Sequence, residues 1–247
     1  MKNRTDYSVY GLNNAISILS SKKYIINSII IMNGSVAESN SQIQNLIKNR
    51  KSQLVFLNKK DFLIKCKNKH SQGIIVNFSA DFLKELDLYQ FNQENICFVI
   101  IDQINDPQNL GQIIRTCECA GINGIILPKH GSVHMTNTVL QVSQGAFDNI
   151  NLYMVTNIKN TIDLLKKNDF WVIGMENSLD CKDWYEMDYT KKVAIVFGSE
   201  SKGIRKLVKK SCDFLSTIPM SGKTNSLNVS ASISAVVFER KRQLQSK

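Results

Sequence analysis

Apolar residues in the first third of the chain occur in short runs separated by stretches of helical spacing. Short apolar runs predict buried strands, and apolar residues that recur every three or four positions predict helices. The strands are predicted at residues 29–32, 54–57 and 73–76, and the helices at residues 10–19 and 41–49. This alternation predicts a small α/β domain over residues 1–78.

The pattern becomes more regular after a polar, acidic stretch at residues 79–95, which we interpret as a linker. Strands are then predicted at residues 96–101, 124–127, 170–174 and 193–198, with a helix at 108–120. Strands that are apolar throughout are typical of a parallel sheet covered on both faces. Residues 96–247 are therefore predicted to form an α/β domain that binds ligands beyond the carboxyl ends of its strands.

The composition indicates a folded protein without a membrane segment. Of the 247 residues, 43% are hydrophobic and 21% are charged, which is close to the average for globular proteins. The longest apolar run, at residues 24–32, contains two polar residues and is too short to cross a bilayer. The polar N-terminus is followed by no apolar stretch typical of a secretory signal. We therefore expect a cytoplasmic protein with no membrane partner.

The cysteines argue against both disulfides and a metal. The six cysteines form no C-x-x-C pair, and the three histidines complete no zinc spacing. Cys117 and Cys119 are close in sequence, but on a helix their side chains would point about 200° apart. That separation suits neither a disulfide nor a shared metal ion. We predict free thiols and no metal site.

The charge is positive and unevenly distributed. Thirty-one basic and 21 acidic residues give a formal net charge of +10. Residues 48–69 hold many lysines and arginines with Asp61 as their single acidic residue. Such a cluster favours contact with the phosphate backbone of a nucleic acid. A lysine-rich face in contact with water explains the same cluster, and charge alone does not decide between the two.

Residues 105–121 follow the first predicted strand of the second domain and open a helix. Asn109 would lie near the helix start, where free backbone N–H groups attract an anion. Arg115 would follow in the second turn, and its guanidinium suits an RNA phosphate or a carboxylate. The alternative is an N-cap asparagine and a surface arginine without a function.

Residues 196–205 join a predicted strand to a helix through a glycine-rich turn. Gly198 ends the strand, Glu200 supplies a carboxylate, and Gly203 allows close approach of the backbone to a ligand. This order is typical of a binding loop. An ordinary turn capped by Ser199 or Ser201 is the alternative.

Residues 217–230 run from a strand end through a polar loop into a helix rich in serine and alanine. Ser226 and Asn228 offer a hydroxyl and an amide that suit a ribose, but a tightly packed helix without chemistry has the same composition.

The segment 221–224 resembles the end of a phosphate-binding loop, yet position 217 is Thr217 instead of glycine. The sequence therefore argues against a nucleotide hydrolase, and the missing G-x-G-x-x-G argues against an ordinary dehydrogenase.

Taken together, the segments DPQNLGQIIRTCECAGI, VFGSESKGI and IPMSGKTNSLNVSAS resemble the three signature motifs of the SpoU (TrmH-like) RNA methyltransferases of the SPOUT superfamily. The segments VYGLNNAISIL and HSQGIIV further resemble the RlmB-like branch, which methylates a guanosine of 23S rRNA. That branch carries a small RNA-binding domain, related to a ribosomal-protein fold, ahead of its catalytic domain. The loop at residues 222–225 departs from the family in being more basic and polar.

The resemblance implies a deep trefoil knot in the second domain, a rare exception to unknotted topology. It also implies a homodimer, an RNA substrate and S-adenosylmethionine as the cofactor, with no metal. By motif match, the cofactor-binding residues would be Gly198, Gly203, Ile218, Met220 and Leu227. The catalytic residues would be Asn109, Arg115, Glu200, Ser226 and Asn228.

The implied reaction is attack of a ribose 2′-oxygen on the cofactor methyl group. The motifs contain no histidine, the usual general base. Arg115 remains charged at all ordinary pH values, so we assign it to phosphate binding and to stabilising the developing alkoxide. Two alternatives remain: a tRNA 2′-O-methyltransferase, and a non-catalytic RNA-binding ribosome-assembly factor on the same fold.

Overall fold

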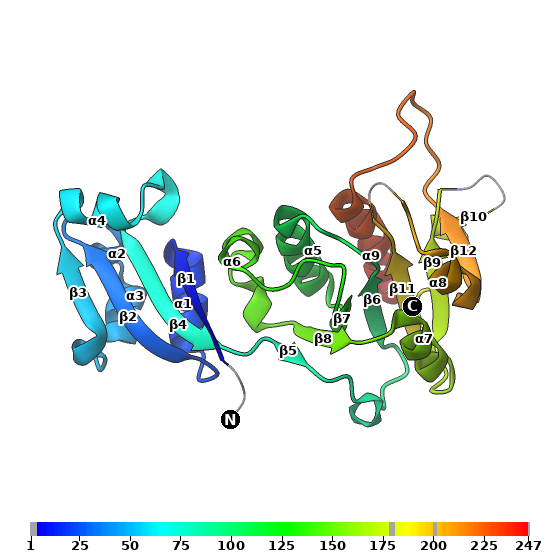
Figure 1. Ribbon diagram of the computed structural model, residues 1–247, viewed down its shortest axis with the longest axis horizontal. Helices are drawn as coiled ribbons and strands as arrows, with labels where there is room; N and C mark the ends of the chain where they lie inside the picture. The colour runs from blue at the N-terminus through cyan, green and yellow to red at the C-terminus, as the bar shows by residue number, and fades with distance from the viewer. Residues whose placement is uncertain (1–3, 178–180, 200–201, 247) are drawn as a thin grey trace. The chain divides into compact units, whose positions relative to one another are not determined.

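The structure is a computed structural model that describes residues 4–177, 181–199 and 202–246. The chain divides into two compact units. The first contains Met1–Phe82 and Met135–Asn149, and the second contains Leu83–His134 and Ile150–Lys247. Figure 1 labels the helices and strands of each unit.

The first unit is built on a four-stranded sheet in the order β1-β4-β2-β3. Strand β4 is antiparallel to both of its neighbours, and β3 is parallel to β2 at one edge. The strands are β1 (Thr5–Tyr10), β2 (Ile25–Met32), β3 (Leu54–Leu57) and β4 (Ile74–Ala80). The helices are α1 (Leu12–Ser20), α2 (Val36–Ser39), α3 (Ser41–Ile47), α4 (Lys59–Lys65) and α6 (Asn137–Ser143).

The predicted strands at 29–32 and 54–57 fall within β2 and β3, and the one at 73–76 overlaps β4, which begins one residue later and extends to Ala80, and so these three strands are confirmed. Strand β1 was missed because polar residues interrupt its apolar ones. Helix α6 belongs to the first unit through contacts with β1 that a hydrophobic pattern does not reveal. The side chain of Gln141 accepts a hydrogen bond from the Tyr10 N–H (3.0 Å) and donates one to the Tyr10 carbonyl (2.9 Å).

The second unit is built on an eight-stranded sheet in the order β10-β12-β9-β11-β6-β7-β8-β5. Its neighbouring strands are parallel, which confirms the predicted parallel α/β architecture. The strands are β5 (Leu83–Lys84), β6 (Cys97–Ile101), β7 (Gly124–Pro128), β8 (Asn151–Val155), β9 (Trp171–Met175), β10 (Lys182–Asp183), β11 (Val193–Phe197) and β12 (Phe214–Thr217). The helices are α5 (Pro107–Ala120), α7 (Ile158–Lys166), α8 (Lys206–Ser211) and α9 (Val229–Gln245).

The strand order of this sheet brings together the strand ends at which a ligand could bind. The chain places β11 between β9 and β6, and then places β12 on the outer side of β9. The carboxyl ends of four neighbouring parallel strands therefore lie along one edge, where α/β sheets bind ligands. Helices α5 and α9 pack against each other (Figure 1). Ser230 of α9 donates a hydrogen bond to the side chain of Gln112 on α5 (2.8 Å).

Within the described part of the chain, no helix is both long and apolar enough to cross a membrane. The trefoil knot and the homodimer implied by the resemblance stay predictions.

The six cysteines are free thiols that differ sharply in exposure. Cys97 and Cys117 are buried, and Cys119 is exposed on the same helix as Cys117. Burial raises the pKa of the Cys97 thiol to about 11 and raises the pKa of Cys117 well above its ordinary value. The thiolate is the reactive form, and so both the raised pKa and the lack of access protect these two residues.

We therefore expect iodoacetamide at pH 8 to alkylate Cys119 of the folded protein well before Cys97 and Cys117. Peptide mass spectrometry after timed quenching measures the three rates, and the same reaction in denaturant is the control because it should equalise them. Modification of Cys117 as fast as Cys119 in the folded protein would contradict the packing of α5 described above.

Candidate functional site

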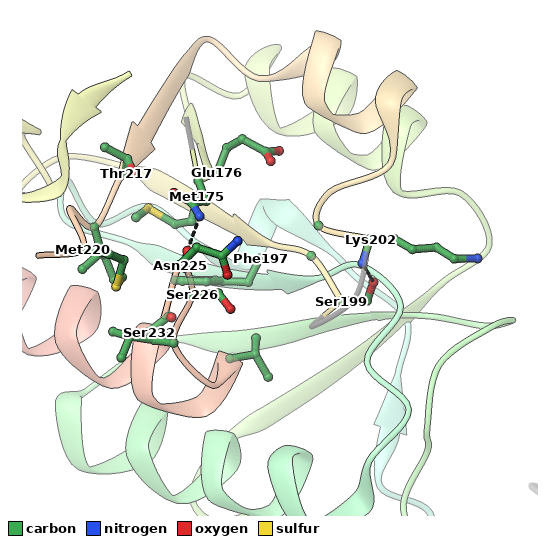
Figure 2. Close-up of a pocket in the computed structure, with 16 residues that line it drawn as sticks. Met175, Glu176, Phe197, Ser199, Lys202, Thr217, Met220, Asn225, Ser226 and Ser232 are labelled. Carbon is green, nitrogen blue, oxygen red and sulfur yellow. Dashed lines mark hydrogen bonds between the residues drawn. The ribbon is translucent and has the colours of Figure 1, made fainter. Parts of the chain in front are cut away.

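A pocket of about 400 Å³ lies at the carboxyl edge of the second unit's sheet. Its walls come from the residues that follow β9, β11 and β12 and from the start of α9. Figure 2 shows side chains from these separate segments around one space. The lining includes every residue predicted to bind the cofactor, together with Ser226: Gly198, Gly203, Ile218, Met220, Ser226 and Leu227.

The loop after β11 forms one wall of this pocket and folds back on itself. The Ser199 N–H donates to the Gly203 carbonyl (3.1 Å), and the Gly203 N–H donates to the Ser199 carbonyl (2.9 Å). A Cβ atom on Gly198 would overlap backbone atoms of Gly203 and Ile204. Gly203 itself has a φ of +63°, a conformation that residues with side chains rarely adopt. Both glycines are thus required by the backbone of the loop.

A buried carboxylate anchors the far end of the same loop. Asp102 follows β6 directly and has no solvent-exposed surface. Its two oxygens accept hydrogen bonds from the Arg205 main-chain N–H (3.0 Å) and from Nε of the Arg205 side chain (2.8 Å). A terminal guanidinium nitrogen of Arg205 lies 2.7 Å from Oδ1 of Asp102. A buried carboxylate needs such partners, and so Asp102 holds the end of the loop beside β6.

The first and third predicted motifs meet through two asparagines. Asn228 is the N-cap of α9, and its side-chain oxygen accepts from the Ser230 N–H (2.9 Å). Its side-chain nitrogen donates to Oδ1 of Asn109 (3.0 Å). Asn109 is buried in the first turn of α5, whose N-cap is Asp106. The alternative of Asn109 as an N-cap is therefore wrong, whereas Asn228 is a cap and also a neighbour of Asn109.

The pocket lining does not include three of the predicted catalytic residues, Asn109, Arg115 and Asn228. Arg115 lies on the exposed face of α5 and is not among the residues that line the pocket. Glu200 lies outside the described residues. The roles assigned to both stay predictions. Of the five predicted catalytic residues, the structure places Ser226 in the pocket wall and links Asn228 to Asn109 beside it.

The pocket also contains residues that the sequence reasoning missed. Met175 ends β9, Glu176 and Asn177 follow it, and the Asn177 side chain donates a hydrogen bond to the Asn225 carbonyl. The rule that ligands bind at the carboxyl ends of parallel strands could have indicated them, but they lie outside the three motifs. Among the described residues, no group of three or more histidine, cysteine or acidic side chains is arranged to hold a metal ion.

Comparisons with known proteins agree with this architecture. The model of the SpoU rRNA methylase family matches residues 96–238. A Staphylococcus aureus (strain COL) protein, named as a TrmH family tRNA/rRNA methyltransferase, is 37% identical over 88% of this chain and 89% of its own length. YacO of Bacillus subtilis, with the same family name, is 35% identical over 98% of both chains.

Solved structures share the fold of the chain. The SpoU methyltransferase AviRb from Streptomyces viridochromogenes, crystallised with AdoMet, has a TM-score of 0.80 at 20% identity and covers 98% of this chain and 92% of its own. The AdoMet-bound rRNA methyltransferase from Sinorhizobium meliloti has a TM-score of 0.76 at 22% identity, covering 97% and 88%. With the family model, the sequence relatives and the matching fold in agreement, the chain belongs to the SpoU rRNA methylase family.

Proposed function

We propose that this protein transfers a methyl group from S-adenosylmethionine to the ribose 2′-hydroxyl of an RNA nucleotide, with a guanosine of 23S rRNA as the favoured substrate. One observation carries the proposal. The second and third family motifs each supply a segment of the pocket wall, and the Asn228–Asn109 hydrogen bond joins the third motif to the helix of the first.

The pocket suits the cofactor in size and chemistry. Its volume of about 400 Å³ lies in the usual range for small-molecule sites. Phe197, Met220 and Leu227 offer apolar surface for an adenine and a thioether, and the backbone of the loop after β11 offers polar groups. The residues present therefore fit S-adenosylmethionine, which supplies an electrophilic methyl group when it is bound.

The chain's own residues would bind and orient the RNA ribose beside that pocket. Ser226 offers a hydroxyl in the pocket wall, and Asn228 is held in a fixed rotamer by its bonds to Ser230 and Asn109. Arg115 offers an exposed guanidinium on the helix that carries Asn109. Its guanidinium would bind an RNA phosphate and stabilise negative charge that develops on the 2′-oxygen. Glu200 is the fifth residue that we propose to be catalytic, beside Asn109, Arg115, Ser226 and Asn228.

The first unit supports an RNA substrate through its charge. Lysines around β3 and α4 are exposed: Lys48, Lys51, Lys59, Lys60, Lys65 and Lys67. Phe56 of the edge strand β3 is also exposed, at 49% of its surface. Exposed lysines neutralise phosphates, and an exposed aromatic ring offers a stacking surface for a base. This combination favours RNA contact over a merely hydrated face.

Reversing two of these charges is expected to weaken RNA binding. Lys59→Glu combined with Lys60→Glu removes two phosphate partners, so the slope of log K against log salt should become shallower by about one to two. Acidic residues are tolerated at the start of a helix, so α4 should persist. Filter binding to a 23S rRNA fragment at several salt concentrations measures the slope.

The control for this prediction is Lys167→Glu combined with Lys191→Glu, which reverses two exposed charges in the second unit. The control should change RNA affinity less than the α4 pair. An equal loss in both double variants would mean that net charge, instead of the β3–α4 surface, determines binding.

Mapping of 2′-O-methyl positions in RNA from cells with and without the protein tests the proposed substrate. The proposal expects one position in 23S rRNA to lose its methyl group in the deletion strain and to regain it when the gene is returned. Loss of a tRNA methyl group would identify the tRNA enzyme instead, and an unchanged map would favour a non-catalytic RNA-binding protein.

A further inference from the structure

An acidic side chain, Glu176, lies in the wall of the pocket and belongs to none of the three family motifs. It directly follows β9, and its main-chain N–H donates to the Ser216 carbonyl (2.9 Å). Its backbone is therefore fixed by the adjoining end of β12. The side chain is 20% exposed and is one of the residues that line the pocket.

The two oxygens of the Glu176 carboxylate face different groups. One lies 3.5 Å from the ammonium of Lys209 on α8. The other lies 3.3 Å from the position that a Cβ atom on Gly203 would take, beside the loop that closes the pocket. A carboxylate accepts several hydrogen bonds, and the separation from Lys209 is longer than a well-formed hydrogen bond. The carboxylate therefore retains acceptor capacity on the side of the Gly203 loop.

We infer, on the basis of the proposed function, that Glu176 accepts hydrogen bonds from the ribose hydroxyls of the bound cofactor. The adenosyl cofactor carries two kinds of group that a carboxylate attracts: neutral donors, which are the ribose hydroxyls and the adenine amino group, and positive charges. The ammonium of Lys209 already lies beside Glu176 and would repel a second cation, whereas it leaves a neutral hydroxyl unaffected. Carboxylates beyond the ends of parallel strands also bind ribose hydroxyls in other α/β folds.

Three ligands separate the positive groups of the cofactor from its neutral adenosine part. S-adenosylmethionine carries the ribose, the amino-acid group and the positive sulfur. S-adenosylhomocysteine lacks the positive sulfur, and 5′-methylthioadenosine lacks both the positive sulfur and the amino-acid group while keeping adenine and the ribose. Isothermal titration of the full-length wild-type protein and the Glu176→Gln variant with each ligand gives the dissociation constants.

A separate titration uses 5′-methylthioinosine, which keeps the ribose but has an oxygen in place of the adenine amino group. A ribose contact requires the same loss of affinity in Glu176→Gln with it as with 5′-methylthioadenosine, and no loss with it would place Glu176 at the amino group.

A ribose contact predicts that Glu176→Gln weakens binding of all three ligands by a similar factor, about tenfold or more, since charged hydrogen bonds are the stronger ones. Lys209→Met is the matched control, because it also breaks the ion pair but keeps the carboxylate. It should leave the three dissociation constants within about threefold of wild type, which is small beside the effect of one charged bond.

Each other outcome overturns the inference in a distinguishable way. Weaker binding of the two amino-acid-containing ligands alone would place Glu176 at the ammonium, and weaker binding of S-adenosylmethionine alone would place it at the sulfonium. An equal loss of affinity in Lys209→Met would show that the ion pair acts only by supporting the structure of the pocket. Unchanged affinity in Glu176→Gln would show that Glu176 makes no contact with the cofactor. If wild-type protein binds none of the ligands, the proposed function fails instead.

Discussion

Replacing Gly198 by alanine is expected to reduce S-adenosylmethionine binding by at least about a hundredfold, the equivalent of two tenfold steps in the dissociation constant. The added Cβ atom would overlap backbone atoms of Gly203 and Ile204, which cannot move aside as a flexible side chain could. Relief of the overlap requires the two hydrogen bonds between Ser199 and Gly203 to open. Because this loop forms a pocket wall, the pocket itself should be lost.

Gly222→Ala is the matched control for this variant. It makes the same chemical change in the neighbouring loop, where a Cβ atom would meet nothing within 4 Å. Isothermal titration compares the two variants with wild type, and circular dichroism checks that each is folded. A folded Gly198→Ala protein with wild-type affinity would show that the cofactor does not use this loop.

Replacing Arg115 by alanine is expected to lower methyl transfer by about 100- to 1,000-fold or more, the range found when a single group that stabilises developing negative charge is removed. Cofactor affinity should stay within about threefold of wild type, less than the loss of one hydrogen bond, because Arg115 does not line the pocket. Its exposure on α5 means that the substitution removes no buried contact. Folding should therefore be unaffected.

Single-turnover kinetics and titration with S-adenosylmethionine, on the same preparation, separate the two effects. Arg115→Lys serves as the control, since lysine keeps the charge and loses the forked geometry that binds phosphate through two bonds. Its rate should lie between those of wild type and Arg115→Ala. If Arg115→Ala transferred methyl groups at the wild-type rate, Arg115 would have no role in catalysis.

The local elements and six of the sixteen residues that line the pocket could be predicted because their signals are local. The fully buried strands β6 and β11 are continuous apolar runs, and the glycines of the loop between β11 and α8 stand within one short motif. Contacts between residues far apart in the chain could not be predicted from a single sequence. The contact between Asn109 and Asn228 joins residues 119 positions apart, and no pattern within either segment indicates it.

Two further residues show the same limit. In the sequence, Asp102 is only the polar residue that ends an apolar run. It holds the end of the loop after β11 by binding Arg205, which lies 103 positions later. Glu176 follows β9, but its place in the pocket depends on β12 and β11 being the neighbours of that strand. Strand order is set by packing of the whole sheet, and the hydrophobic pattern of one strand does not encode it.

The central claim is transfer of a cofactor methyl group to a ribose 2′-oxygen, and one measurement tests it most directly. Purified protein is incubated with unmodified 23S rRNA, and in a parallel reaction with unmodified tRNA, in the presence of S-adenosylmethionine labelled in its methyl group. The RNA is then hydrolysed with alkali. A 2′-O-methyl group blocks cleavage of the adjacent phosphodiester, so the proposal predicts that the label appears in an alkali-resistant dinucleotide. Label found in a single nucleotide with a methylated base, or no label in 23S rRNA or tRNA, would contradict it.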